Sequence, residues 1–248
     1  MVKGVEIFKE YFKDYTDQYV LIGGAACDII FANNEANFRA TRDLDIVLII
    51  EALNEEFGNK FWNFIKDGDY QHKSSNMDKP QFYRFSKPKE QTFPKMIELF
   101  TRNTFELKEI NGLTPIHVDD EISSLSAILL DKDYYHVLLQ GKTTIDNLSV
   151  LRPEYLILFK AKAYLDLSKR KANGEHVDSS DIKKHKKDIL RILAELLLEN
   201  VNQLPQSVKE DINLFINSLS YEPYDEQFLK QYGLKNEEII NLLTKIYK

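Results

Sequence analysis

The chain has 248 residues, enough for one large domain or two small ones. Its 43% hydrophobic content can build a core, and its formal net charge of −6 gives no general basic surface for nucleic acid, although a local basic face would suffice. The single cysteine, Cys27, excludes an internal disulfide and fits a reducing cytoplasm. Because neither a signal peptide nor a run of ~20 apolar residues is found, we expect a soluble cytoplasmic protein with no membrane partner.

The first half of the chain alternates predicted helices and strands. The Ile46–Ile50 run inside the second strand implies burial on both faces of a sheet. An aromatic stripe over residues 53–65 is typical of a helix packed on a core. The predicted helices span residues 5–12, 25–31 and 53–65, and the strands span 19–22, 43–50, 70–74, 81–86 and 96–101, with a turn at 76–80. Residues 122–130 and 134–139 are compatible with strands or short helices.

The second half of the chain is predicted to be helical. Pro153 followed by Glu154 is a good helix start, and the helix is expected to run to Lys171. Asp178 is expected to cap a second helix that runs to about residue 199, and three more follow near 207–218, 225–232 and 236–247. The sequence therefore indicates an α+β chain with an α/β catalytic half, residues 1–150, a helical half, 151–248, and a substrate cleft between them.

A glycine pair followed by an acidic pair carries most of the functional information. Gly23 and Gly24 end an apolar strand, and Asp43-Leu44-Asp45 opens the next one. The period of two along a strand places both carboxylates on one face and Leu44 in the core. Two neighbouring carboxylates repel each other unless a cation lies between them, which suggests a divalent-metal site. Glycines before a helix allow backbone N–H groups to approach an anion, so phosphate and Mg²⁺ are expected in one cleft.

The order Gly-Gly, then Arg39-x-Thr41-x-Asp43-Leu44-Asp45, resembles the nucleotidyltransferase superfamily of the DNA polymerase β type, and within it the AbiEii-like toxin branch. The resemblance is specific over residues 20–50. It implies a small mixed β-sheet core flanked by helices and followed by an α-helical C-terminal domain. It also implies two Mg²⁺ ions, an NTP substrate, and transfer of a nucleoside monophosphate to a hydroxyl or phosphate. Either element alone also fits a common turn or a solvated loop edge.

The resemblance calls for a third carboxylate on a neighbouring strand. Glu98 lies in the apolar run Phe93–Phe100, where a charge is costly unless it is paired or binds metal, so it is the best candidate. Its alternative is the exposed face of an edge strand. Glu106 and Glu109 lie in a more polar stretch and are weaker candidates. Asp28, on the helix after the glycines, is expected to face solvent.

The helical half offers further candidates for NTP binding. The family has a lysine before a small residue and a following Asp-x-x-Asp, which resemble Lys160 with Ala163 and Asp178 with Asp181. Lys160 is a candidate to reach the triphosphate as a point charge, and Asp181 to orient it or hold base or sugar. The alternatives are a snorkelling surface lysine and a plain helix cap.

A basic cluster covers residues 183–187 of the same predicted helix. Lys184 lies three residues after Asp181 and shares its helical face, so we expect a phosphate-binding role for it and for Lys187. Lys183 and Lys186 are expected on a solvated face.

These residues together predict a two-metal transfer. Asp43, Asp45 and Glu98 would hold the Mg²⁺ ions, Gly23 and Gly24 would donate backbone hydrogen bonds to the triphosphate, and the Arg39 and Thr41 side chains would contact phosphate or brace the loop. The AbiEii-like resemblance implies an RNA acceptor, such as a tRNA 3′ end, and an antitoxin partner. Antibiotic-type transfer to a small molecule and an inactive nucleotide- or partner-binding member remain as alternatives, as does a simple interaction module.

Overall fold

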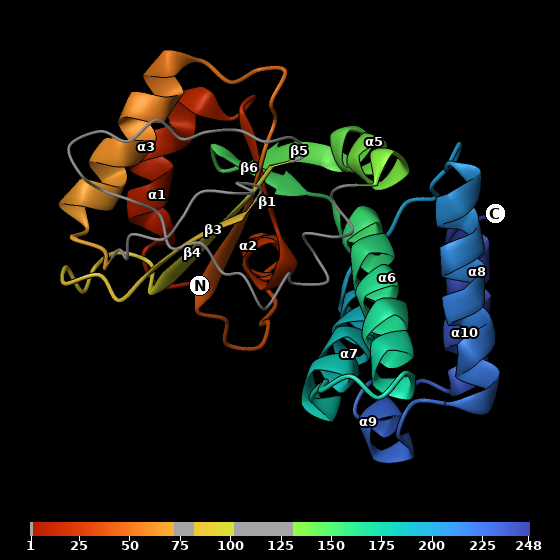
Figure 1. Cartoon of the computed structure of the whole chain (residues 1–248). Helices are drawn as coiled ribbons and strands as arrows, with labels where there is room; N and C mark the ends of the chain where they lie inside the picture. The colour runs from red at the N-terminus through yellow and green to blue at the C-terminus, as the bar shows by residue number, and fades with distance from the viewer. Residues whose placement is uncertain (1, 72–81, 102–130) are drawn as a thin grey trace. The chain divides into compact units, whose positions relative to one another are not determined.

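The computed structural model describes residues 2–71, 82–101 and 131–248. The chain divides into two compact units. The first, here called the sheet unit, comprises Met1–Leu130 and Lys142–Arg152, and the second, the helical unit, comprises Asp131–Gly141 and Pro153–Lys248. The helical unit thus takes a segment that precedes the last two strands in the sequence (Figure 1).

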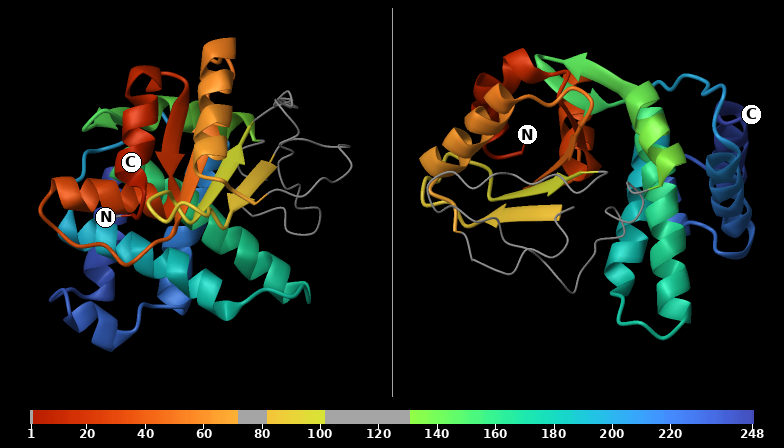
Figure 2. Two further views of the ribbon diagram at one scale, coloured as in Figure 1. Left: turned by 90° about the vertical axis from the view of Figure 1, so that its left-hand side faces the viewer. Right: turned by 45° about the horizontal axis from the view of Figure 1, so that its top comes forward.

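The sheet unit contains a mixed six-stranded sheet with the order β3-β4-β2-β1-β6-β5. The central strands β1 and β2 are antiparallel, β2 is parallel to β4, and β1 is parallel to β6. The antiparallel pairs β3–β4 and β5–β6 form the two ends of this order, and Figure 2 shows β3 and β4 side by side. The strands are β1 (Tyr19–Ile22), β2 (Asp43–Leu48), β3 (Phe82–Ser86), β4 (Met96–Phe100), β5 (Lys142–Ile145) and β6 (Leu148–Leu151). The expected mixed sheet flanked by helices, with further helices in the C-terminal part, is confirmed.

Helices α1 (Val5–Phe12) and α3 (Glu55–Asp67) supply an aromatic core for one face of this sheet. The Phe8 ring meets Tyr19 of β1 edge-on at 5.3 Å and Phe64 of α3 at 5.7 Å. Phe85 of β3 meets Phe61 at 5.6 Å. Each such ring pair contributes stabilising free energy beyond that of the apolar area it buries, so these rings fix the two helices on the sheet. The predicted aromatic stripe is therefore core, and α3 begins one residue after Asn54, whose side chain accepts from the Phe57 N–H.

Helix α2 (Gly23–Asn33) packs against β1, β2 and β5. Figure 1 shows α2 on the opposite side of the strands from α1 and α3. Because α2 contacts three strands, it is buried along nearly its whole length, from Gly24 to Phe31. The expectation that Asp28 faces solvent is wrong, since this residue is 9% exposed.

The β5–β6 hairpin is an element that the sequence analysis did not predict. Asp146 and Asn147 have φ values of 48° and 59°, which are those of a two-residue turn with both central residues left-handed. Asp and Asn are, with Gly, the residues that dominate such turns, so this pair between short runs of β-branched and apolar residues fits the hairpin. Through β6, this hairpin extends the sheet beyond β1.

The helical unit is built around α6 (Pro153–Ala172), which packs against α5 (Lys132–Gly141), α7 (Ser179–Glu195) and α8 (Gln206–Tyr221). Two shorter helices, α9 (Glu226–Lys230) and α10 (Asn236–Ile246), complete it. The start at Pro153 and the Asp178 cap are confirmed, because the Asp178 carboxylate accepts from the Ser180 N–H at 2.8 Å. Residues 134–139, left open between strand and helix, are helical.

A few predictions fall outside the described ranges. These are the turn at 76–80, the element at 122–130 and the candidates Glu106 and Glu109. Of the strand expected at 70–74, the structure shows an isolated bridge between Gln71 and Ser86. In the described part of the chain, no helix has both the length and the apolar character needed to cross a membrane.

Candidate functional site

The candidate carboxylates lie on one face of the central strands. Asp45 of β2 is paired with Ile22 of β1 on one side and with Glu98 of β4 on the other. Because paired residues point to the same face of a sheet and residues two apart share a face, Asp43, Asp45 and Glu98 all project from the face opposite Leu44. Leu44 is fully buried, as predicted, whereas the three carboxylate residues are half-buried.

Gly23 brings the start of α2 directly against Asp45. Its φ of +65° is left-handed, and it turns the chain from β1 into α2. A Cβ placed on Gly23 would lie 1.9 Å from Asp45 Oδ2. Since real Cβ atoms do not approach an oxygen so closely, the absence of a side chain at Gly23 is what allows the carboxylate to occupy its position.

Gly24 makes the corresponding approach to the segment before β2. A Cβ on Gly24 would lie 2.6 Å from Thr41 Oγ1 and 3.6 Å from Arg39 Nη2. The structure therefore brings Gly23 together with Asp45, and Gly24 together with Thr41 and Arg39. These residues are separated by the whole of α2 in the sequence and gather where β1 ends and β2 begins.

Arg84 is a site residue that sequence reasoning missed. It lies opposite Glu98 in the β3–β4 register, and its Nε and Nη2 atoms contact Glu98 Oε1 at 2.8 Å and 2.6 Å. Both side chains are mostly buried, and the guanidinium neutralises the carboxylate that it contacts. The available signal was a charged residue inside the short run Phe82–Phe85 of a predicted strand, whose pairing with the Glu98 strand was not predicted.

The carboxylates suit a magnesium ion by their donor chemistry. Mg²⁺ is usually bound by one or two carboxylates together with waters and substrate phosphates, and Asp43 and Asp45 supply two on one face. Within the described ranges, however, no group of three or more His, Cys, Asp and Glu side chains is arranged to hold a metal. Glu98 forms an ion pair with Arg84, and its role as a third metal ligand stays a prediction.

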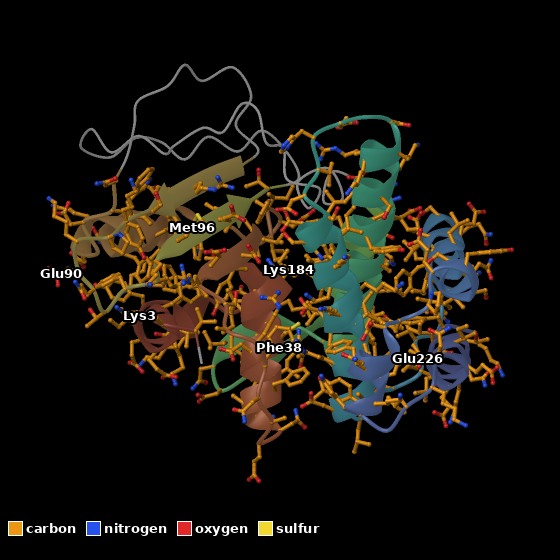
Figure 3. The ribbon with its side chains drawn as sticks, turned by 90° about the horizontal axis from the view of Figure 1, so that it is seen from below. Lys3, Phe38, Glu90, Met96, Lys184 and Glu226 are labelled. Atoms are coloured by element: carbon orange, nitrogen blue, oxygen red, sulfur yellow. The ribbon has the colours of Figure 1, made fainter. Side chains whose placement is uncertain are left out.

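A basic pocket of about 540 Å³ opens beside Asp43 in the sheet unit. Among the residues that the structure describes, its wall has four cationic side chains and one acidic residue, Asp43; the cationic residues are Lys3, Arg42, Lys87 and Lys95. Figure 3 labels Lys3 and Met96, which also lines it. This charge pattern favours an anionic group next to the carboxylate strand, because a cluster of like charges in a hollow raises the local concentration of the opposite charge.

The candidates of the helical unit have a different setting. Lys160 is 5% exposed, and its Nζ donates to Asp188 Oδ2 at 2.9 Å. Arg191 Nη1 contacts the other carboxylate oxygen of Asp188 at 3.3 Å. Lys160 is therefore part of a buried ion pair and is not a snorkelling surface residue, and its contact with an NTP stays a prediction.

The other candidates of this unit lie on the surface of α7. Asp181 and Lys184 are exposed, and their roles in NTP binding also stay predictions. Lys186, expected on a solvated face, is half-buried. The reason is that residues 222–224 cover α7 there: the backbone carbonyls of Glu222 and Pro223 accept from Lys186, and the Tyr224 ring lies beside it.

The fold and this cluster define an α+β protein with paired carboxylates and a glycine turn on a mixed sheet. The chain matches no protein-family model and no curated protein sequence. Among solved structures, it is similar to the crystal structure of an antigenic nucleotidyltransferase-like protein from Paracoccidioides brasiliensis, with 15% sequence identity and a TM-score of 0.46 over 100% of this chain and 96% of that chain.

Proposed function

We propose that this chain is a metal-dependent nucleotidyltransferase that moves a nucleoside monophosphate from an NTP to RNA. The observation that carries the proposal is the close approach of Gly23 to Asp45, which joins a helix N-terminus and a carboxylate pair at the end of β1. A helix N-terminus can bind phosphate, and a carboxylate pair can bind a divalent cation. A triphosphate bound through Mg²⁺ needs both chemistries at one place.

The residues of this chain take the following parts in the proposed reaction. Asp43 and Asp45 would hold Mg²⁺, which neutralises phosphate charge and lowers the pKa of an acceptor hydroxyl. Backbone N–H groups at the start of α2 would donate to phosphate oxygens, and Arg39 lies beside Gly24 to assist them. The acceptor oxygen bonds to the α-phosphorus, the bond from this phosphorus to the bridging oxygen breaks, and pyrophosphate leaves; the acceptor proton passes to solvent.

Arg84 and Glu98 would support the acceptor side of this site. The ion pair fixes the Glu98 carboxylate on the same face as Asp45, one strand away. From there it can orient the acceptor hydroxyl, which is a positioning role that does not require direct contact with a metal.

The basic pocket beside Asp43 supports RNA over a cationic antibiotic as the acceptor. Its four cationic side chains would repel a drug with several ammonium groups and attract a phosphate backbone. The AbiEii-like toxin assignment and an antitoxin partner belong to this proposal and rest on the motif over residues 20–50.

The test is transfer of label from each α-³²P-NTP to total RNA in the presence of Mg²⁺. Asp45→Asn should lower labelling by at least about 100-fold, since even outer-shell changes at metal sites cost up to about that much. Asp14→Asn is the matched control, because Asp14 is an exposed aspartate of the same unit. Wild-type labelling by Asp45→Asn would refute the metal role. Stabilisation by Mg²⁺–NTP that needs Asp45, without any labelled RNA, would instead point to another acceptor.

A further inference from the structure

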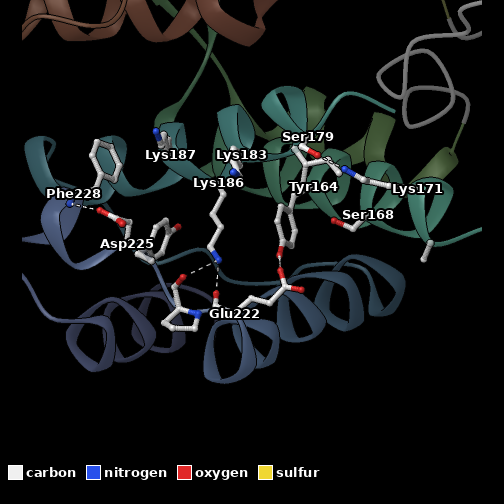
Figure 4. A pocket seen from close by; sticks show the side chains of 14 residues that line it. Tyr164, Ser168, Lys171, Ser179, Lys183, Lys186, Lys187, Glu222, Asp225 and Phe228 are labelled. Atoms are coloured by element: carbon white, nitrogen blue, oxygen red, sulfur yellow. Dashed lines mark hydrogen bonds between the residues drawn. The ribbon is translucent and has the colours of Figure 1, made fainter. Parts of the chain in front are cut away.

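A second and larger pocket, of about 810 Å³, lies within the helical unit. It is formed by α6, α7 and the segment from Glu222 to Phe228, and Figure 4 shows its lining side chains. Its volume is in the range of pockets that hold small organic ligands. Each residue of its wall belongs to the helical unit, so the pocket is complete without the carboxylate site of the sheet unit.

The wall of this pocket is positively charged in a chain of net negative charge. Four lysines line it, Lys171, Lys183, Lys186 and Lys187. The two carboxylates of the wall already have partners. Glu222 accepts from the Tyr164 hydroxyl at 2.7 Å, and Asp225 caps α9 by accepting from the Phe228 N–H at 3.0 Å.

Two lysines of the wall, Lys186 and Lys187, contact backbone carbonyls or aromatic rings. Lys186 Nζ donates to the backbone carbonyls of Glu222 and Pro223, and it lies 5.1 Å from the centre of the Tyr224 ring. Burial lowers the pKa of Lys186, because its charge is only partly compensated there. Lys187 lies 5.4 Å from the centre of the Phe228 ring. Aromatic rings orient these ammonium groups and leave their charge available to an anion.

A buried hydroxyl in the same wall also lacks a partner. Tyr224 is 5% exposed, and its hydroxyl makes no hydrogen bond to any described residue. Buried polar groups in folded proteins are nearly always hydrogen-bonded, and a lone one calls for an explanation. This oxygen is closed off from solvent, so a ligand in the pocket would reach it only after the wall moves.

We infer that this pocket binds a nucleoside phosphate, with the phosphate at Lys183, Lys186 and Lys187. Lysine side chains bind phosphate as point charges, and planar bases stack on aromatic rings. Ile182, Pro223 and Phe228 supply the apolar part of the wall for the base. The ligand is either a free nucleotide or one nucleotide unit of a single-stranded RNA, since both present the same groups. This site goes beyond the proposed transfer reaction and does not depend on it.

The test measures binding of AMP, ATP and hexa-adenylate RNA to the Asp45→Asn protein in EDTA by isothermal titration calorimetry. The substitution and the chelator remove metal-dependent binding at the carboxylate strand, so this result stands apart from that of the RNA-labelling assay. Reversing two exposed charges with Lys183→Glu and Lys187→Glu should weaken binding at least about tenfold. Lys245→Glu makes the same change at an exposed position of α10, outside the pocket, and should leave affinity unchanged.

Tyr224→Phe probes the buried hydroxyl separately. It removes an unpartnered group that is closed off from solvent, so the melting temperature should not fall and affinity should stay within about threefold of the parent protein. Tighter binding of hexa-adenylate than of AMP and ATP would identify RNA as the ligand, and equal binding would identify the free nucleotide. The inference is overturned if none of the probes binds, if the double charge reversal leaves affinity unchanged, or if tripolyphosphate binds as tightly as ATP.

Discussion

The approach of Gly23 to Asp45 leads to a prediction that separates stability from function. Gly23→Ala forces an L-residue into φ +65°, which costs about 1–2 kcal/mol. The added Cβ would meet Asp45 Oδ2 at 1.9 Å and Cγ at 2.9 Å. Because these atoms belong to a side chain, the carboxylate should rotate away while the backbone stays in place. We therefore expect a stability loss close to the strain alone, together with loss of RNA labelling.

Gly233→Ala is the matched control. Gly233 has the same φ of +65°, but no atom lies within 4 Å of the position of its Cβ. Both variants should lose about 1–2 kcal/mol in urea denaturation followed by far-UV circular dichroism. The single tryptophan, Trp62, is 3% exposed in α3, so its fluorescence reports the sheet unit separately. Equal RNA labelling by the two variants would show that the position of the Asp45 carboxylate does not matter for the reaction.

Three further predictions concern stability. A double-mutant cycle of Arg84→Gln and Glu98→Gln should give a coupling energy of about 1–2 kcal/mol, a value between those of solvent-exposed and of fully buried ion pairs. A coupling energy near zero would contradict the ion pair. Lys160→Met leaves the buried Asp188 charge only partly neutralised, so it should lower the free energy of unfolding by about 3–5 kcal/mol in urea denaturation. Adding Asp188→Leu should recover part of this loss. A loss under about 1 kcal/mol for Lys160→Met would contradict the prediction. Burial raises the pKa of three core tyrosines, so above about pH 10 the unfolded chain loses their protons first and stability should fall by up to about 1.4 kcal/mol per pH unit for each. A stability that stays flat to about pH 11 would refute the assignment of raised pKa values. These tyrosines are Tyr19, Tyr70 and Tyr134.

Local sequence patterns predicted the elements that position the candidate site. The alternation in Asp43-Leu44-Asp45 is a property of three residues, so it correctly placed Leu44 in the core. The strands expected at 81–86 and 96–101 followed from short apolar runs, and the structure has them as β3 and β4, although their antiparallel pairing with each other was not predicted. That Glu98 pairs with Asp45 depends on register between strands that are distant in the sequence, and period-two patterns alone do not fix that register.

The environment of charged residues was the harder part to predict. Lys160 and Asp28 have ordinary helical neighbours in the sequence, yet both are buried. The lysine is paired with Asp188 of α7, and the aspartate lies on α2, which packs against three strands of the sheet. Similarly, a single arginine in β3 gained its significance only when β3 paired with the Glu98 strand.

The basic cluster of α7 shows how helix geometry and tertiary cover act together. Residues three and four apart share a helical face. Lys183, Lys186 and Lys187 therefore share one face, and Asp181 and Lys184 share another. From the sequence, we expected the phosphate-binding role at Lys184 and Lys187 and a solvated face for Lys183 and Lys186. The segment from Glu222 to Phe228 distinguishes the two faces, because it folds over the first one and turns it into a pocket. The phosphate-binding role that the sequence suggested for Lys184 and Lys187 stays a prediction, and Lys187 lines this pocket together with Lys183 and Lys186.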